Sequence, residues 1–209
     1  MMRLLLVILA SCAAVEVYDG VPVNPASHMA FDVVTLEGDQ HIKITLVTRG
    51  HAAHLGGNLY VAPRHVIGAG PCWLRTRDAV FQVEELASGT PAYRPTTFDD
   101  VLDDWVIFRT DPGVPDVARS VSVSGGDFAT LLPSGERCRV TEVFDECLII
   151  ERGPLEPGWS GTPVAVHGHV IGFVHGMYGD MYGDGVIIIP LPLRPLAQAL
   201  HTAGAQERR

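Results

Sequence analysis

The sequence predicts an all-β protein. Its 209 residues include 22 glycines and 15 prolines, which is typical of a chain that turns often. Short runs of Val, Ile and Leu recur between the turns, and hardly any segment shows the 3.6-residue apolar period of an amphipathic helix. Hydrophobic residues make up 47% of the chain, enough for a packed core. We therefore expect many short strands joined by turns.

The charge balance bears on the class of partner. The formal net charge is −9, and Lys and Arg are not clustered anywhere. Binding to nucleic acid depends on basic side chains that neutralise phosphates. A nucleic-acid partner is therefore not expected, and a polypeptide substrate is.

No metal or disulfide framework is expected. The histidine pairs in HAAH (51–54) and HGH (167–169) lack the glutamate of an HExxH zinc motif. The four cysteines are scattered without CxxC spacing: Cys12, Cys72, Cys138 and Cys147. Such cysteines are usually small buried residues, although Cys138 and Cys147 could face each other across a hairpin.

The chain begins with a compact apolar stretch, MMRLLLVILASCAA (1–14). It is shorter than the roughly 20 residues that cross a bilayer. It fits a short signal peptide, the end of a longer membrane segment, or a first core strand. Leu9-Ala10-Ser11-Cys12 also resembles a bacterial lipoprotein box with Cys12 as the lipidated residue. We assign 1–16 as an apolar leader, which is either a signal peptide or a segment derived from a membrane span or from a protein cofactor.

Strand-like runs then form an N-terminal lobe, assigned to 17–110. They are separated by turn residues such as Glu37-Gly38-Asp39 and Gly56-Gly57. The expected strands are 31–36, 40–48, 58–62, 80–86 and 105–109.

A Pro, Gly and Asp-rich segment (110–117) is the expected connection to a C-terminal lobe at 118–193. The expected strands of this lobe are 119–123, 128–132, 137–144, 147–152, 162–166, 169–175 and 185–190. Residues 194–209 show a modest helical pattern and are assigned as a terminal helix or linker.

A candidate nucleophile lies in Gly158-Trp159-Ser160-Gly161-Thr162-Pro163. A serine hydroxyl attacks well only from a tight, exposed turn, next to a general base and to backbone N–H groups that hold an oxyanion. Glycines on both sides make such a turn sterically possible. The alternative is an ordinary turn between two strands.

Two residues upstream suit the roles of base and acid. His65 follows a strand and precedes small residues, so that one ring nitrogen can stay exposed. Asp104 stands immediately before an apolar run, where a buried carboxylate needs a partner such as a histidine N–H. Asp103 is the substitute, and the other acids of 98–104 are expected in a solvated turn.

The order His65, Asp104, Ser160 across two lobes resembles that of chymotrypsin-like serine proteases. The sequence is most similar to the flavivirus-type nonstructural serine protease, with a Pro-Gly-x-Ser-Gly-x-Pro match at 157–163. This resemblance implies two six-stranded antiparallel β-barrels with the site between them. It also implies His65 as base, Asp104 as its orienting acid, and Ser160 as nucleophile, with the N–H groups of Gly158 and Ser160 as the oxyanion hole.

Specificity is less clearly indicated. Basic-specific relatives carry an acid where this chain has Pro154. The stretch Gly172 to Gly176 resembles the Gly-x-x-His of picornavirus-type proteases, whose histidine reads Gln or Glu in the first specificity pocket. This resemblance implies substrate binding by His175, Gly176 and Tyr178; the alternative is an ordinary strand histidine.

The resemblance implies a serine endopeptidase that processes a viral polyprotein through an acyl-enzyme. It implies a host-cytoplasmic location at a membrane, a cofactor strand from a small membrane-bound viral protein, and a downstream helicase. No small-molecule cofactor is expected. Two alternatives stay open: a secreted or lipid-anchored bacterial trypsin-like protease, and an inactive protease-fold module that binds peptides.

Overall fold

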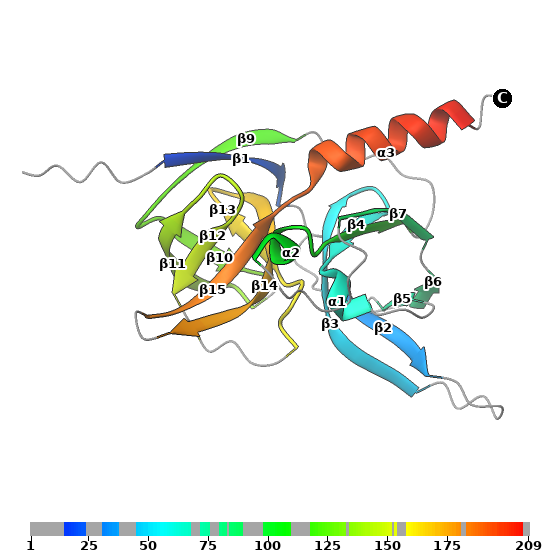
Figure 1. Ribbon diagram of the computed structural model, residues 1–209, viewed down its shortest axis with the longest axis horizontal. Helices are drawn as coiled ribbons and strands as arrows, with labels where there is room; N and C mark the ends of the chain where they lie inside the picture. The colour runs from blue at the N-terminus through cyan, green and yellow to red at the C-terminus, as the bar shows by residue number, and fades with distance from the viewer. Residues whose placement is uncertain are drawn as a thin grey trace, which may run out of the picture.

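The computed structural model describes residues 15–23, 31–37, 45–67, 72–75, 80–82, 84–89, 98–109, 118–132, 134–151, 153, 158–180 and 183–206. The leader at 1–14 and the residues 154–157 before the serine turn lie outside these ranges. The described chain forms two β-sheets side by side, with three helices (Figure 1). None of the described helices is long and apolar enough to span a membrane.

The C-terminal lobe is a closed barrel with two added strands. The barrel consists of β10 (Phe128–Leu131), β11 (Glu136–Val143), β12 (Leu148–Glu151), β15 (Gly183–Pro190), β14 (His169–Asp180) and β13 (Pro163–Val166). It closes because β13 pairs with both β10 and β14. Beyond β14 the sheet continues with β1 (Val15–Pro22) and β9 (Arg119–Ser124). Inward-facing side chains such as Val140, Ile150 and Ile188 are fully buried in its core.

The N-terminal lobe is a seven-stranded sheet. Its order is β6 (Val80–Gln82), β5 (Cys72–Arg75), β2 (Phe31–Glu37), β3 (Thr45–Gly56), β4 (Leu59–Ala62), β8 (Val106–Arg109) and β7 (Glu84–Ser88). Within the described strands, its end strands β6 and β7 do not pair with each other. The prediction of a mainly β protein is thus confirmed. Within the described residues one six-stranded barrel is closed, whereas closure of the second sheet into a barrel is not shown. The end strands β6 and β7 are separated by a single residue, 83, so the two ends of this sheet are consecutive along the chain.

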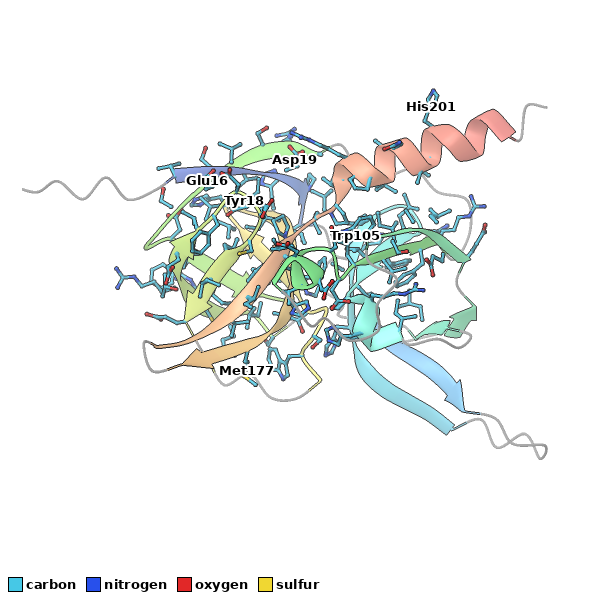
Figure 2. All side chains as sticks on the ribbon, viewed as in Figure 1. Glu16, Tyr18, Asp19, Trp105, Met177 and His201 are labelled. Atoms are coloured by element: carbon cyan, nitrogen blue, oxygen red, sulfur yellow. The ribbon has the colours of Figure 1, made fainter. Side chains whose placement is uncertain are left out.

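Each end of the described chain packs on the opposite lobe. β1 pairs with β9 and β14 of the C-terminal lobe, so the predicted division at residue 17 needs correction here. The reason is burial: Tyr18 lies in the core of the C-terminal lobe, 3% exposed (Figure 2). Conversely, α3 (Leu193–Gln206) contacts β7 of the N-terminal lobe (Figure 1). The other predicted boundaries stay predictions.

A shared core holds the two lobes together. Leu55, Leu59 and Ile107 of the N-terminal lobe belong to the same buried cluster as Phe173 and Ile189 of the barrel. All five are at most 2% exposed. Each fully buried side chain of this size contributes about 1.5–3 kcal/mol relative to an exposed one, so the lobes are fixed against each other.

The two described free cysteines do not meet across the hairpin. The β11–β12 register pairs Val140 with Ile150 and Val143 with Leu148, which places Cys147 at the turn and Cys138 toward the far end. They also lie in different hydrophobic clusters. Burial raises the pKa of both thiols, so each behaves as a buried apolar group.

Candidate active site

His65 lies on a one-turn helix, α1 (Arg64–Ile67), directly after β4 and Pro63. Val66 and Ile67 are buried in the N-terminal core and anchor this helix. The His65 side chain remains 27% exposed. The sequence therefore placed His65 correctly at the end of a strand, and the helix fixes its backbone while one edge of the ring reaches solvent.

Asp104 follows the short helix α2 (Phe98–Leu102) and comes two residues before β8. It is completely buried, whereas Asp99 and Asp103 are exposed. Its backbone N–H donates to Val101 O at 3.2 Å, which ties the residue to the end of α2. Asp104, not Asp103, is the acid that contacts His65.

Two hydrogen bonds join His65 to Asp104. The backbone N–H of His65 donates to Asp104 Oδ1 at 3.0 Å, and the ring Nδ1 is hydrogen-bonded to Oδ2. A carboxylate only accepts hydrogen bonds, so Nδ1 carries the proton. This tautomer leaves the other ring nitrogen, Nε2, free to accept a proton, as a general base must.

A second histidine shares the same carboxylate oxygen. His175 Nε2 lies 2.8 Å from Asp104 Oδ2, and His175 is only 8% exposed. The rings of His65 and His175 meet edge-on, with centroids 5.1 Å apart. The predicted role of His175 in a specificity pocket stays a prediction; in the structure its Nε2 is bonded to Asp104.

The two imidazoles decide the charge of Asp104. Burial alone would raise the pKa of this carboxyl, but the hydrogen bonds from His175 and His65 lower it to about 2. Asp104 is therefore ionised at neutral pH. An ionised acid beside His65 can stabilise the imidazolium that forms when the ring takes up a proton.

Ser160 occupies the second position of a tight turn. The Thr162 N–H donates to Trp159 O at 3.0 Å, which closes the turn. Gly161 has φ = 88°, the positive value that a type II turn requires at its third position. The Gly161 N–H donates to Val174 O at 2.6 Å, so the turn is held on β14, next to His175.

The serine turn also touches the N-terminal lobe. The His51 N–H donates to Ser160 O at 2.7 Å. A Cβ added to Gly50 would lie 2.5 Å from Ser160 O and 2.9 Å from Val66 Cγ1, so Gly50 stands between Ser160 and the residue after His65. A Cβ on Gly161 would lie 1.8 Å from His51 O. The sequence marked Gly50 only as a turn residue, and no local signal reveals this close approach.

Two further groups complete the arrangement around Ser160. Within the described residues, neither the Gly158 nor the Ser160 N–H donates to a backbone carbonyl, and their predicted role in an oxyanion hole stays a prediction. Within the same ranges no hydrogen bond joins Ser160 Oγ to His65. Catalytic hydrogen bonds are often long in ligand-free enzymes and shorten when substrate binds.

The site also contains a possible set of metal ligands. One ligand atom each from His65, Asp104 and His175 lies within 4.8 Å of the others, and such a set suits Zn²⁺. Both ring nitrogens, however, are bonded directly to one carboxylate oxygen. An ion bound about 2 Å from each atom would have to break both hydrogen bonds. In the structure, hydrogen bonds and not a metal ion join His65 and His175 to Asp104.

The predicted substrate-binding residues continue along β14. Gly176 pairs with Ile187 and Tyr178 with Gly185 on β15, while the side chain of Tyr178 lies outside the described part. A Cβ added to Gly176 would meet nothing within 4 Å. In the described strands, 176–180 pair only with β15.

Comparisons with known proteins show the fold. No family model and no curated protein matches the chain. The active form of the Rv3671c protease from M. tuberculosis is 19% identical, with 87% of each chain covered and a TM-score of 0.53. Kallikrein-related peptidase 10 in complex with Zn²⁺ is 12% identical over 81% of this chain and 92% of that one, with a TM-score of 0.52.

A mutant of human heparin binding protein is 11% identical over 88% of this chain and 96% of that one, with a TM-score of 0.57. At these identities the likeness concerns the fold, and a flavivirus-type origin is not shown. The chain is similar in fold to chymotrypsin-like serine proteases, a bacterial protease among them.

Proposed function

We propose that this protein is a serine endopeptidase that uses Ser160, His65 and Asp104. One observation carries the proposal: a histidine whose Nδ1–H is bonded to a buried carboxylate, with Nε2 free, lies beside a constrained serine turn. The three residues come from two lobes that share one core. The likeness in fold to serine peptidases supports the same reaction class.

The proposed reaction has two halves. Ser160 Oγ attacks the carbonyl carbon of the peptide bond while His65 Nε2 takes the hydroxyl proton, and Asp104 stabilises the resulting imidazolium. The N–H groups of Gly158 and Ser160 hold the oxyanion. When the C–N bond breaks, His65 returns its proton to the leaving amine. Water, activated by the same nitrogen, then releases the acid from Ser160.

The substrate would bind as an added strand. In the described strands, β14 from Gly176 onward pairs only with β15, which supports an unpaired edge immediately after His175. An extended peptide can hydrogen-bond to such an edge through its backbone. In this proposal the substrate chain runs along 176–178, and His175 has no role in side-chain recognition.

Two finer versions of the proposal differ in biological setting. The Pro-Gly-x-Ser-Gly-x-Pro stretch supports a viral polyprotein protease built of two complete barrels, with a membrane-bound cofactor strand and a downstream helicase, in the host cytoplasm. The apolar leader with its lipoprotein-like Cys12, together with the likeness to the M. tuberculosis protease, supports a secreted or lipid-anchored bacterial protease equally well. Mass spectrometry of the intact mature protein distinguishes the bacterial version, which predicts loss of the leader and, in the lipid-anchored form, an acylated chain that begins at Cys12.

Labelling with a fluorophosphonate probe tests the proposed activity. We expect the wild type to be labelled, Ser160→Ala to be unlabelled, and His65→Ala and Asp104→Asn to react slower by on the order of 10³-fold or more. Ser134→Ala serves as a control, because Ser134 caps a turn through Leu131 O and should not change labelling. A folded wild-type protein without labelling at Ser160 would make the inactive peptide-binding module the better description.

A further inference from the structure

We propose that His175 is a positioning residue, which holds Asp104 in place from the opposite lobe. This inference rests on the proposed function. Asp104 and His65 both belong to the N-terminal lobe, whereas His175 lies on β14 of the barrel. The 2.8 Å contact between His175 Nε2 and Asp104 Oδ2 therefore crosses the boundary between the lobes.

A β-bulge directs His175 to this position. On the β14–β15 ladder, Val174 pairs with Ile188 and Gly176 pairs with the next residue, Ile187, so His175 is an extra residue without a partner. Bulges bend a strand and redirect a side chain, and they are frequent beside active sites. Because of this bulge, the His175 ring reaches the buried carboxylate, and the pairing of β14 continues on both sides of it.

The residue before the bulge holds the nucleophile. Val174 O accepts the Gly161 N–H at 2.6 Å, and the Val174 N–H donates to Thr162 O at 2.9 Å. Consecutive residues of β14 thus fix the serine turn through the backbone and the acid through a side chain. A displacement of β14 relative to the N-terminal lobe would disturb both at once.

The chemistry at Asp104 explains why the contact matters. Oδ1 accepts the His65 backbone N–H, and Oδ2 accepts His65 Nδ1–H and His175 Nε2–H. The carboxylate is fully buried, so another protein group or an admitted water would have to replace a lost donor. Without His175, we expect the carboxylate to turn and its bond to His65 Nδ1–H to weaken.

Three variants separate a positioning role from a merely structural one. His175→Phe keeps a ring but removes the donor, and His175→Gln keeps an N–H donor at similar reach. The control is His54→Phe, at a second buried histidine, whose Nε2 contacts Gly57 O at 2.7 Å within the N-terminal lobe. Circular dichroism at a temperature below all melting transitions confirms that each variant is folded.

The first readout is independent of turnover. In protein with ¹⁵N-labelled histidine, NMR should show His175 protonated at Nε2 and a downfield Nδ1–H proton for His65. In His175→Phe this proton should move upfield or be lost, whereas His175→Gln and His54→Phe should retain it. A wild-type His175 without a proton on Nε2 would overturn the proposal even if no variant folds.

The second readout is the rate of peptide hydrolysis. We expect His175→Phe to lower kcat about 10- to 100-fold, the worth of one charge-assisted hydrogen bond. KM should stay within about twofold, and His175→Gln should restore most of kcat. Unchanged kcat and an unchanged His65 proton in folded His175→Phe would contradict the positioning role. An unreactive Ser160 with the expected NMR pattern would instead refute the peptidase and leave the contact in place.

Discussion

The two halves of the candidate site are held by different kinds of interaction. The acid–base half depends on side chains, since His65 and His175 both bond to the buried carboxylate of Asp104. The nucleophile half depends on the backbone, since Gly161 has a positive φ and lies against the His51 carbonyl. The first half should therefore respond to the loss of a hydrogen-bonding atom and the second to an added methyl group.

The largest effect is expected from Asp104→Asn. The amide keeps the shape of the carboxylate but not its charge, and it favours the wrong tautomer of His65. We expect kcat to fall by on the order of 10³–10⁴, measured with a peptide substrate. Asp103→Asn is the matched control: its side chain is exposed, and it should stay within about twofold of the wild type. Equal losses in both variants would mean that the aspartates act through the local structure alone.

Gly161→Ala should break the other half. The new Cβ would lie 1.8 Å from His51 O, at a residue with φ = 88°. A clash with backbone cannot be relieved by a rotamer change, so we expect the free energy of unfolding to fall by about 3–5 kcal/mol. The measurement is urea denaturation.

Gly168→Ala separates the clash from the dihedral angle. Gly168 has φ = 78°, but an added Cβ meets nothing within 4 Å. The left-handed conformation alone should cost about 1–2 kcal/mol. Similar unfolding midpoints for the two variants would show that the contact between Gly161 and His51 relaxes easily.

Sequence patterns predict the residues of the candidate site more readily than the contacts between them. Ser160 was recognisable between its glycines, and Asp104 by its position before an apolar run. The bulge at His175 cannot be recognised in the local sequence, because it is a register shift between two paired strands. The approach of Gly50 to Ser160 likewise joins residues 110 positions apart, and only the packed lobes bring them together.

The same limit applies to the fold. The extended character of β1 can be read from the sequence, but the sequence does not say which sheet this strand joins; β1 lies in the opposite lobe from the one predicted. Closure of the barrel by β13 is also a matter of pairing between distant strands. The β class and most strands follow from composition and turns, whereas the expected set missed β1 and β5, and the strand partners follow from the packing of side chains.

A pH titration of stability should detect the charged acid. The pKa of Asp104 is lowered to about 2 in the folded protein, compared with about 4 in an unfolded chain. Its stabilisation is therefore fully present above pH 4 and is lost as the pH falls toward 2. It amounts to about 2 kcal/mol. The unfolding free energies of wild type and Asp104→Asn should converge over this interval; a constant difference would mean that folding does not shift the pKa of Asp104.

The smallest effect is expected away from both halves, at Tyr18 of β1. Its hydroxyl donates to Phe144 O at 2.6 Å, and Cys147 O lies 3.1 Å away. Burial raises the pKa of Tyr18 to about 12. The protonated tyrosine therefore contributes its full stabilisation of the fold below pH 10. This contribution disappears between about pH 10 and 12, because only the unfolded tyrosine ionises there. Tyr18→Phe should lower the unfolding free energy by about 1 kcal/mol and leave kcat within about twofold. A tenfold loss of kcat would show instead that β1 supports the site through the neighbouring β14.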